Sequence, residues 1–154
     1  MSNLKDLIAR QRAEVEAPKS LPVNVALGGE LVEVEISRLL PDDWDALVLA
    51  HPPRATSRSD AKIGYDQRAL PRNYPASHIR VAGEPVDQET WVEVYASLRS
   101  VNKNNVGTLM WGLNIFDELK ELQALGKAAA GRQSSSPANR ESRRAASKAG
   151  NRAK

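Results

Sequence analysis

Alternating apolar and polar residues between positions 22 and 37 predict a β-hairpin. Apolar residues occupy every second position in 23–27 and again in 32–36, with Gly28 and Gly29 between the two runs. Successive side chains of a strand point to opposite faces, so each run places its apolar residues on one face. Two adjacent glycines suit a two-residue turn, whose backbone requires φ > 0. A lone hairpin is marginal, so it must pack on helices or pair with another strand, for which residues 78–81 are the candidate.

Four further segments space their apolar residues by three and four positions, as amphipathic helices do. They cover residues 2–16, 41–50, 87–100 and 105–125. Asp87 is the predicted N-cap of the third helix, and Gly126 is the predicted C-cap of the fourth. Residues 102–105 are interpreted as a polar turn between these two. Helices and hairpin together predict an α+β fold, a small domain of about four helices with a β-hairpin and a possible third strand.

The connection over residues 52–77 contains four prolines and several charges, and its pattern predicts no regular element. A structureless connection of this length is unusual in a compact domain, so it is either functional or mobile. Ile63, Tyr65 and Leu70 are the residues expected to anchor it to the core.

Charge divides the chain unevenly. Residues 127–154 hold eight basic residues and one acidic residue, a net charge of +7, whereas the other 126 residues have a net charge of −4. The same stretch lacks Leu, Ile, Val and all aromatic residues, so it cannot bury enough apolar surface to offset its ordering entropy. We therefore expect an N-terminal helix over 1–19, a folded α+β domain over 20–126 and a disordered basic tail over 127–154.

Such a tail has two interpretations. It is either a nucleic-acid-binding arm or a solubilising segment that happens to be basic. The absence of aromatic residues, on which bases stack, favours the second interpretation. Any contact with nucleic acid is expected to be weak and sensitive to salt.

The residue inventory argues against an enzyme. There is no cysteine, which excludes disulfides, thiolate metal sites and thiol catalysis. The two histidines, His51 and His78, have no metal-site spacing, and no zinc-protease, phosphate-loop or nucleophile-elbow motif occurs. Asp42 and Asp43 suit the positive end of a helix better than acid–base chemistry. We therefore predict no catalytic, cofactor-binding or metal-binding residue and no cofactor.

Two further features of the sequence are a polar cluster in the long connection and three tryptophans. Asp60, Tyr65 and Asp66 form the only group in the long connection that suits a ligand, and solvated loop polarity is the favoured interpretation. The tryptophans all fall on apolar helix faces, which predicts core packing; they are Trp44, Trp91 and Trp111.

No apolar run approaches the roughly 20 residues of a membrane helix, and charges interrupt the first 18 residues, so neither membrane insertion nor secretion is expected.

Several short motifs, taken in order, resemble a phage protein family. They are SRLLPDDWDAL (37–47), HPPR (51–54), the GYD and ALP segment (64–71), a W…L helix (91–98) and WGLN (111–114). Their series is similar to that of the tail assembly chaperones of long-tailed phages, especially those of actinobacterial hosts. HPPR followed by GYD and ALP is its most distinctive part.

The resemblance implies a non-catalytic chaperone in the host cell cytoplasm. Such chaperones come as a short form and a longer form made by programmed ribosomal frameshifting. Both are thought to coat the long, hydrophobic tape measure protein, and the longer form recruits tail tube subunits. The chaperone is absent from the finished virion. Self-association is also compatible with this role.

A chaperone of this kind needs an apolar groove or stripe that holds a client helix. The candidate partner-binding residues lie on the outer side of the last predicted helix; they are Met110, Ile115, Leu119 and Leu122. Methionine suits a promiscuous groove because its side chain is flexible and polarizable. The alternative is that this stripe belongs entirely to the core.

Gly126-Lys127 suggests where a frameshift would fall. Codons GGA-AAG after a codon ending in G would let both tRNAs re-pair one base back, and the longer product would then replace residues 128–154. The gene sequence tests this hypothesis. Two other functions remain open, a nucleic-acid-binding adapter acting through the basic tail and a minor structural protein of the virion.

Overall fold

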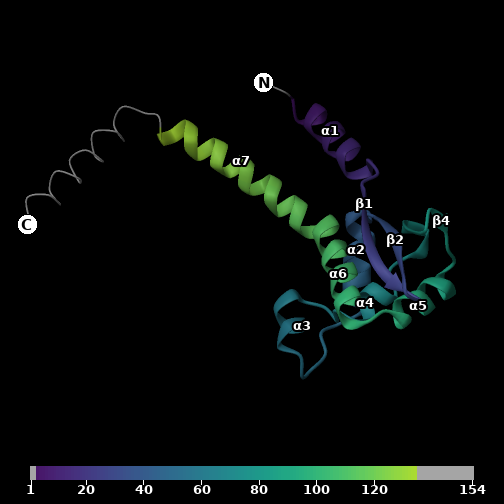
Figure 1. Ribbon diagram of the computed structural model, residues 1–154. Coiled ribbons are helices and arrows are strands. Elements are labelled where there is room, and N and C mark those ends of the chain that lie inside the picture. The colour runs from purple at the N-terminus through teal and green to yellow at the C-terminus, as the bar shows by residue number, and fades with distance from the viewer. Residues whose placement is uncertain (1–2, 135–154) are drawn as a thin grey trace, which may run out of the picture. The chain divides into compact units, whose positions relative to one another are not determined.

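The computed structural model describes residues 3–134, with side chains described for residues 3–131. The chain divides into two compact units, with the boundary between Phe116 and Asp117. The first unit is α+β, as predicted, and combines helices with a four-stranded antiparallel sheet (Figure 1). The second contains one long described helix.

The sheet grows from the predicted hairpin. β1 (Ser20–Leu27) pairs with β2 (Glu30–Ser37) through the turn at Gly28 and Gly29, whose φ angles are 61° and 82°. The predicted third strand is confirmed as β3 (Ile79–Val81), which pairs with β2. Sequence analysis missed β4 (Glu84–Pro85), because two residues are too few to show alternation.

The glycines of the hairpin turn lead to a stability prediction. A Cβ at Gly28 would meet no atom within 4 Å, so its only penalty is the left-handed backbone. Gly28→Ala should therefore lower the free energy of unfolding by about 1 kcal/mol, measured by denaturant titration. Gly112→Ala is the matched control, because Gly112 also has open space but a right-handed φ of −57°. Equal destabilisation by both variants would contradict the backbone explanation.

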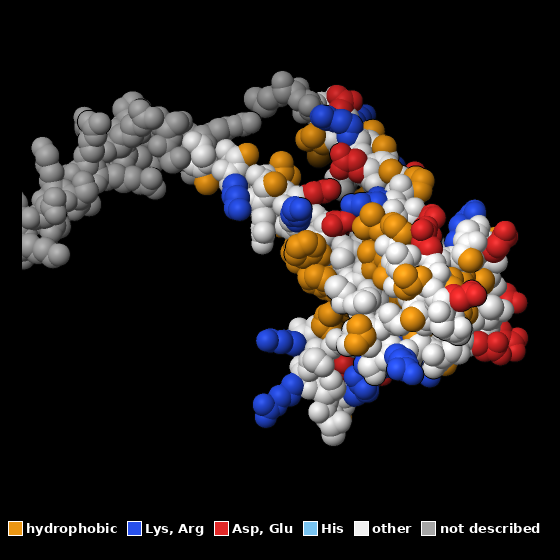
Figure 2. Space-filling view, in the orientation of Figure 1, with side chains coloured by type: hydrophobic (Ala, Val, Ile, Leu, Met, Phe, Trp, Pro, Cys, Tyr) orange, Lys and Arg blue, Asp and Glu red, His pale blue; other side chains and the backbone are white. Residues whose placement is uncertain are grey.

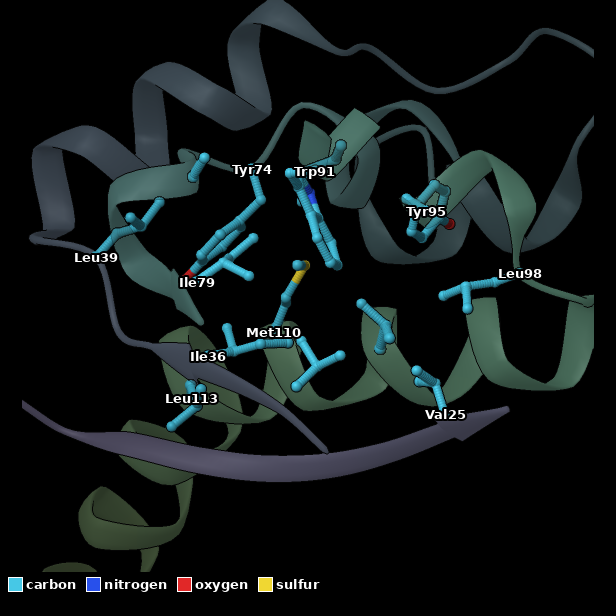
Figure 3. Packing of buried hydrophobic residues seen from close by; sticks show 14 of the residues in the cluster. Val25, Ile36, Leu39, Tyr74, Ile79, Trp91, Tyr95, Leu98, Met110 and Leu113 are labelled. Carbon is cyan, nitrogen blue, oxygen red and sulfur yellow. The ribbon is translucent and has the colours of Figure 1, made fainter. Parts of the chain in front are cut away.

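The core lies between the sheet and the helices that cover it. These are α2 (Pro41–Ala50), α5 (Gln88–Ser97) and α6 (Ser100–Trp111). Figure 3 shows Met110 of α6 at the centre, with Trp91 of α5 and Ile36 of β2 around it. Trp91, Ile36 and Met110 are all fully buried. Asp87 caps α5 as predicted, and its carboxylate accepts a hydrogen bond from the Thr90 backbone N–H at 2.7 Å.

The N-terminal helix is confirmed as α1 (Leu4–Glu16), capped by Asn3. It has no buried residue. Its end is held to the sheet by Arg38, whose guanidinium donates to the backbone carbonyls of Glu14 and Ala17 at 2.9 and 2.8 Å. The helix is thus attached at one end and exposes its apolar residues.

The long connection is not structureless, so that prediction was wrong. It contains α3 (Arg58–Ile63), α4 (Ala69–Arg72) and the 3₁₀ turn η1 (Ala76–His78). These elements have three to six residues, too short for periodicity to reveal. The predicted anchors Tyr65 and Leu70 are buried, and Ile63 packs against the core as well.

The predicted polar turn at 102–105 was also wrong, because these residues lie inside α6. α6 is followed by a π-helical segment, η2 (Gly112–Phe116), and then by α7 (Asp117–Ser134). The predicted C-cap at Gly126 was also wrong, because Gly126 lies inside α7, which ends at Ser134. The alanine-rich residues that follow have high helix propensity, and the helix continues through them.

The predicted disorder was therefore wrong for residues 127–134, which are helical. The rest of that prediction, over residues 135–154, lies outside the described residues. No helix within residues 3–134 combines the length and the apolar character that crossing a membrane requires.

Candidate protein-binding surfaces

The clearest exposed apolar feature in the described part of the second unit is a row of three leucines on α7. Leu119, Leu122 and Leu125 are 46%, 67% and 70% exposed. Helical geometry places residues three apart within 60° of one another, so the three span about a third of the circumference. We call them the leucine stripe. Hydrophobic side chains along the described part of α7 are visible in Figure 2.

Two of the four predicted partner-binding residues, Leu119 and Leu122, belong to the leucine stripe. The prediction was wrong for Met110, which is fully buried in the core. Ile115 is half-buried and packs against the core. The error arose because the prediction assumed one regular helix over 105–125. No single regular α-helix extends over that range, because η2 interrupts it with π-helical geometry.

A pocket of about 370 Å³ opens between α6 and the segment that contains α3 and α4. Its apolar wall is formed by Ile63, Tyr65, Pro71 and Trp111. Trp111 is half-buried and packs against the core, and its ring lies 5.4 Å from that of Phe116. Trp44 and Trp91 are buried as predicted.

Sequence analysis missed the pocket because it interpreted residues 102–105 as a turn. Lys103, Gly107 and Trp111 are spaced by four residues, and all three line the pocket from α6. That spacing places them on one face of a helix. This four-residue spacing could have indicated the pocket from the sequence, but only if residues 102–105 had been recognised as helical.

The segment that walls the pocket is held by a buried carboxylate. Asp60 is fully buried and accepts hydrogen bonds from the Nε, NH2 and backbone N–H of Arg54 at 2.7, 3.2 and 3.1 Å. It also accepts from the backbone N–H of Gln67 at 3.3 Å. The hydrogen-bonded Arg54 guanidinium holds the pKa of Asp60 well below its usual range. We call this arrangement the Arg54–Asp60 lock.

The remaining members of the predicted polar cluster are also used by the fold. Asp66 accepts hydrogen bonds from the backbone N–H groups of Arg68 and Ala69, at the start of α4. Tyr65 packs edge-on against Trp44 at 5.6 Å, and burial raises its pKa to about 12. Solvated loop polarity was therefore the wrong interpretation for Asp60, which is the buried centre of its loop.

A second buried network joins η2 to the connection after β2. The Oδ1 of Asn114 accepts from the Leu39 backbone N–H at 3.0 Å, and its Nδ2 donates to the Tyr74 hydroxyl at 3.1 Å. Tyr74 in turn donates to the Ser37 carbonyl at 2.7 Å, and burial raises its pKa to about 12. Such a network, with every polar group paired, fixes one arrangement of the elements that it joins.

Within the described part of the chain, no group of three or more His, Asp or Glu side chains is placed to hold a metal ion. His51 contacts the Leu47 carbonyl through Nδ1 at 2.9 Å. The features that stand out are the leucine stripe, which is apolar, and the pocket, whose lining is part apolar and part polar.

Comparison of the chain with protein-family models, with curated proteins and with solved structures found no match. Its function must therefore be inferred from its own residues.

Proposed function

We propose that this chain is a tail assembly chaperone of a long-tailed phage. It binds and solubilises the tape measure protein in the host cytoplasm, without catalysis, and a longer frameshifted form helps to recruit tail tube subunits. The chaperone leaves before the virion is complete. The motif series between residues 37 and 114 supports the proposal through its resemblance to that family.

The structure explains what several of those motifs do. The indole N–H of Trp91 donates to the carbonyl of Pro71 at 2.9 Å, which joins the W…L helix to the ALP motif. Arg54 of HPPR binds Asp60, and Asn114 of WGLN binds the backbone of Leu39. The motifs therefore contribute to folding, and their resemblance supports a shared fold more directly than a shared partner.

The single observation that carries the proposed activity is the leucine stripe. Isolated exposed leucines are ordinary, but three in a row on one helix form the kind of patch that marks a protein-binding site. A client helix with its own apolar stripe would bury the leucines by side-by-side packing. Each contact is modest, and many copies on one long client would add avidity.

Co-expression tests the proposal. The full chain is expressed with the product of the longest open reading frame downstream in the same genome, the expected tape measure protein. We expect the long protein to move from the insoluble to the soluble fraction and to copurify with this chain. Expression of the long protein alone supplies the baseline, because an unprotected apolar helix should aggregate.

Two comparisons separate the alternatives. A chain lacking residues 127–154 retains the leucine stripe and should retain the client, whereas an adapter acting through the basic tail would lose its binding. Mass spectrometry of purified virions should not detect an assembly factor, but it would detect a structural component. A long protein that stays insoluble with both forms of the chain would count against the chaperone function.

A further inference from the structure

We propose that the pocket beside α6 receives the leucine stripe of α7 from a second copy of this chain. The occupant is the segment 118–122, which carries Leu119 and Leu122 together with Glu118 and Glu121. Its one basic residue, Lys120, lies on the opposite side of the helix from Leu122. The contact would be a self-association surface, and it involves no client protein.

The pocket combines an apolar wall, which suits leucine side chains, with polar lining residues; these are Ser59, Gln67, Lys103, Asn104 and Thr108. Ile63, Pro71 and Trp111 contribute aliphatic and aromatic surface, and the volume of about 370 Å³ falls in the lower part of the range of binding pockets. Gly107 contributes no side chain, and a Cβ there would lie 3.5 Å from the Pro71 ring. The backbone of α6 thus comes close to α4 at the base of the pocket.

The surroundings of the pocket are cationic. Lys103 lines it directly, with Nζ 5.6 Å from the centre of the Tyr95 ring. Arg58 and Lys62 are exposed on α3, each one residue before a lining residue. Figure 2 shows Lys and Arg side chains around the end of the first unit where α3 lies in Figure 1.

The acidic residues of this region do not cancel that charge. Asp60 is buried in the Arg54–Asp60 lock. Asp66 accepts backbone hydrogen bonds at the start of α4 and lies 3.5 Å from the Arg54 Nε. A pocket with an apolar wall, polar lining residues and positive neighbours favours a segment that combines apolar side chains with carboxylates.

The segment 118–122 of α7 has this composition. Glu118 lies one turn before Leu122, and Glu121 lies one turn before Leu125, so each carboxylate is adjacent to the leucine stripe. A second exposed apolar row within the described residues, on α1, fits less well. Lys5 and Arg12 lie one turn from Ile8 there, and they would place positive charge against a positive rim.

Because the leucine stripe and the pocket are different surfaces, their contact is heterologous. Contacts of this kind build rings or filaments, unless two copies exchange helices reciprocally and close as a dimer. If the proposed function holds, clients would compete with the second copy for the same leucines. Self-association would then protect the stripe until a client displaces the neighbouring copy. The docking itself does not depend on that function.

Charge-swap variants of the full chain test the contact, with sedimentation velocity and light scattering as the readouts. The pocket variant is Lys103→Glu with Thr108→Glu, and the helix variant is Glu118→Lys with Glu121→Lys. We expect the wild-type mass to rise with concentration and to fall as salt increases. Each variant should weaken self-association by at least about tenfold, because like charges would face each other.

Mixing supplies the decisive comparison. The two variants in equal amounts should associate with each other, since each then meets an opposite charge, and the combination of all four substitutions in one chain should self-associate again. Glu93→Lys on α5 is the matched control and should behave as the wild type. Circular dichroism and thermal unfolding test whether each variant is folded. If the pocket variant does not fold, Arg58→Glu with Lys62→Glu replaces it, because both residues are exposed on α3.

Three results would overturn the proposal. They are a wild-type chain that stays monomeric at every concentration, self-association that neither variant changes, and variants that fail to restore association when mixed. Since no client is present, a failure here is distinct from a failure of the co-expression test.

Discussion

Replacing Leu119, Leu122 and Leu125 together with glutamine is expected to abolish client capture. Full burial of a leucine contributes about 1.5–3 kcal/mol, and these leucines are already part-shielded, so we expect a total loss of about 3–6 kcal/mol. That is at least about a hundredfold loss of affinity. Glutamine retains helix propensity, so α7 should stay helical. The measurement is the soluble, copurifying fraction of the tape measure protein on co-expression.

The matched control replaces three exposed apolar residues of the first unit with glutamine, namely Leu31, Leu49 and Val101. These side chains are at least as exposed as the stripe, but they lie on separate elements. We expect client capture to survive this change. Capture that survives loss of the leucine stripe would place the client elsewhere, for example on the exposed row of α1.

Asp60→Asn is expected to have the largest effect on stability among single substitutions of a polar residue. The carboxylate is fully buried and receives four hydrogen bonds, three of them from Arg54. Breaking a buried pair leaves donors without an acceptor. Arg54 is half-exposed and retains water contact, which limits the loss to about 2–4 kcal/mol in the free energy of unfolding. Denaturant titration at neutral pH measures it.

The same substitution makes a prediction about pH. The pKa of Asp60 is lower in the folded chain than in the unfolded chain, so its contribution to stability is fully present above the unfolded pKa of about 4. That contribution is lost as the pH falls below this value toward the folded pKa. The difference in unfolding free energy between the wild type and Asp60→Asn should therefore shrink between about pH 5 and pH 2.

Asp45→Asn provides the control, because Asp45 is an exposed carboxylate on α2. It should change stability by less than about 0.5 kcal/mol at any pH in this range. A wild-type advantage over Asp60→Asn that persists undiminished at pH 2 would mean that the buried charge is not its source.

Local sequence patterns predicted the elements whose periodicity, turn residues and caps match the burial of their side chains in the structure. The β1–β2 hairpin followed from alternation and from two glycines that tolerate positive φ. α5 followed from the Asp87 cap and the stripe of Trp91, Tyr95 and Leu98, all of which are buried. In these segments the local preference and the tertiary contacts agree.

The errors fell where local preference and tertiary context differ. Residues 102–105 are polar, yet they continue α6 because Val106, Met110 and Leu113 further along are buried against the sheet. Asp60 is polar within a polar loop, and only its position relative to Arg54 makes burial favourable. The helix beyond Gly126 is a different kind of error, because the helix propensity of the alanines that follow is itself a local preference.

The sequence by itself therefore determined the α+β fold and the hairpin with its glycine turn, and it named Leu119 and Leu122 as candidate binding residues. Only the tertiary structure decided that Met110 is core, that Asp60 is locked by Arg54 and that a pocket opens beside α6. The physical reason is the range of the interactions. Periodicity and capping act within one or two turns of chain, whereas burial and pocket shape depend on which distant segments pack together.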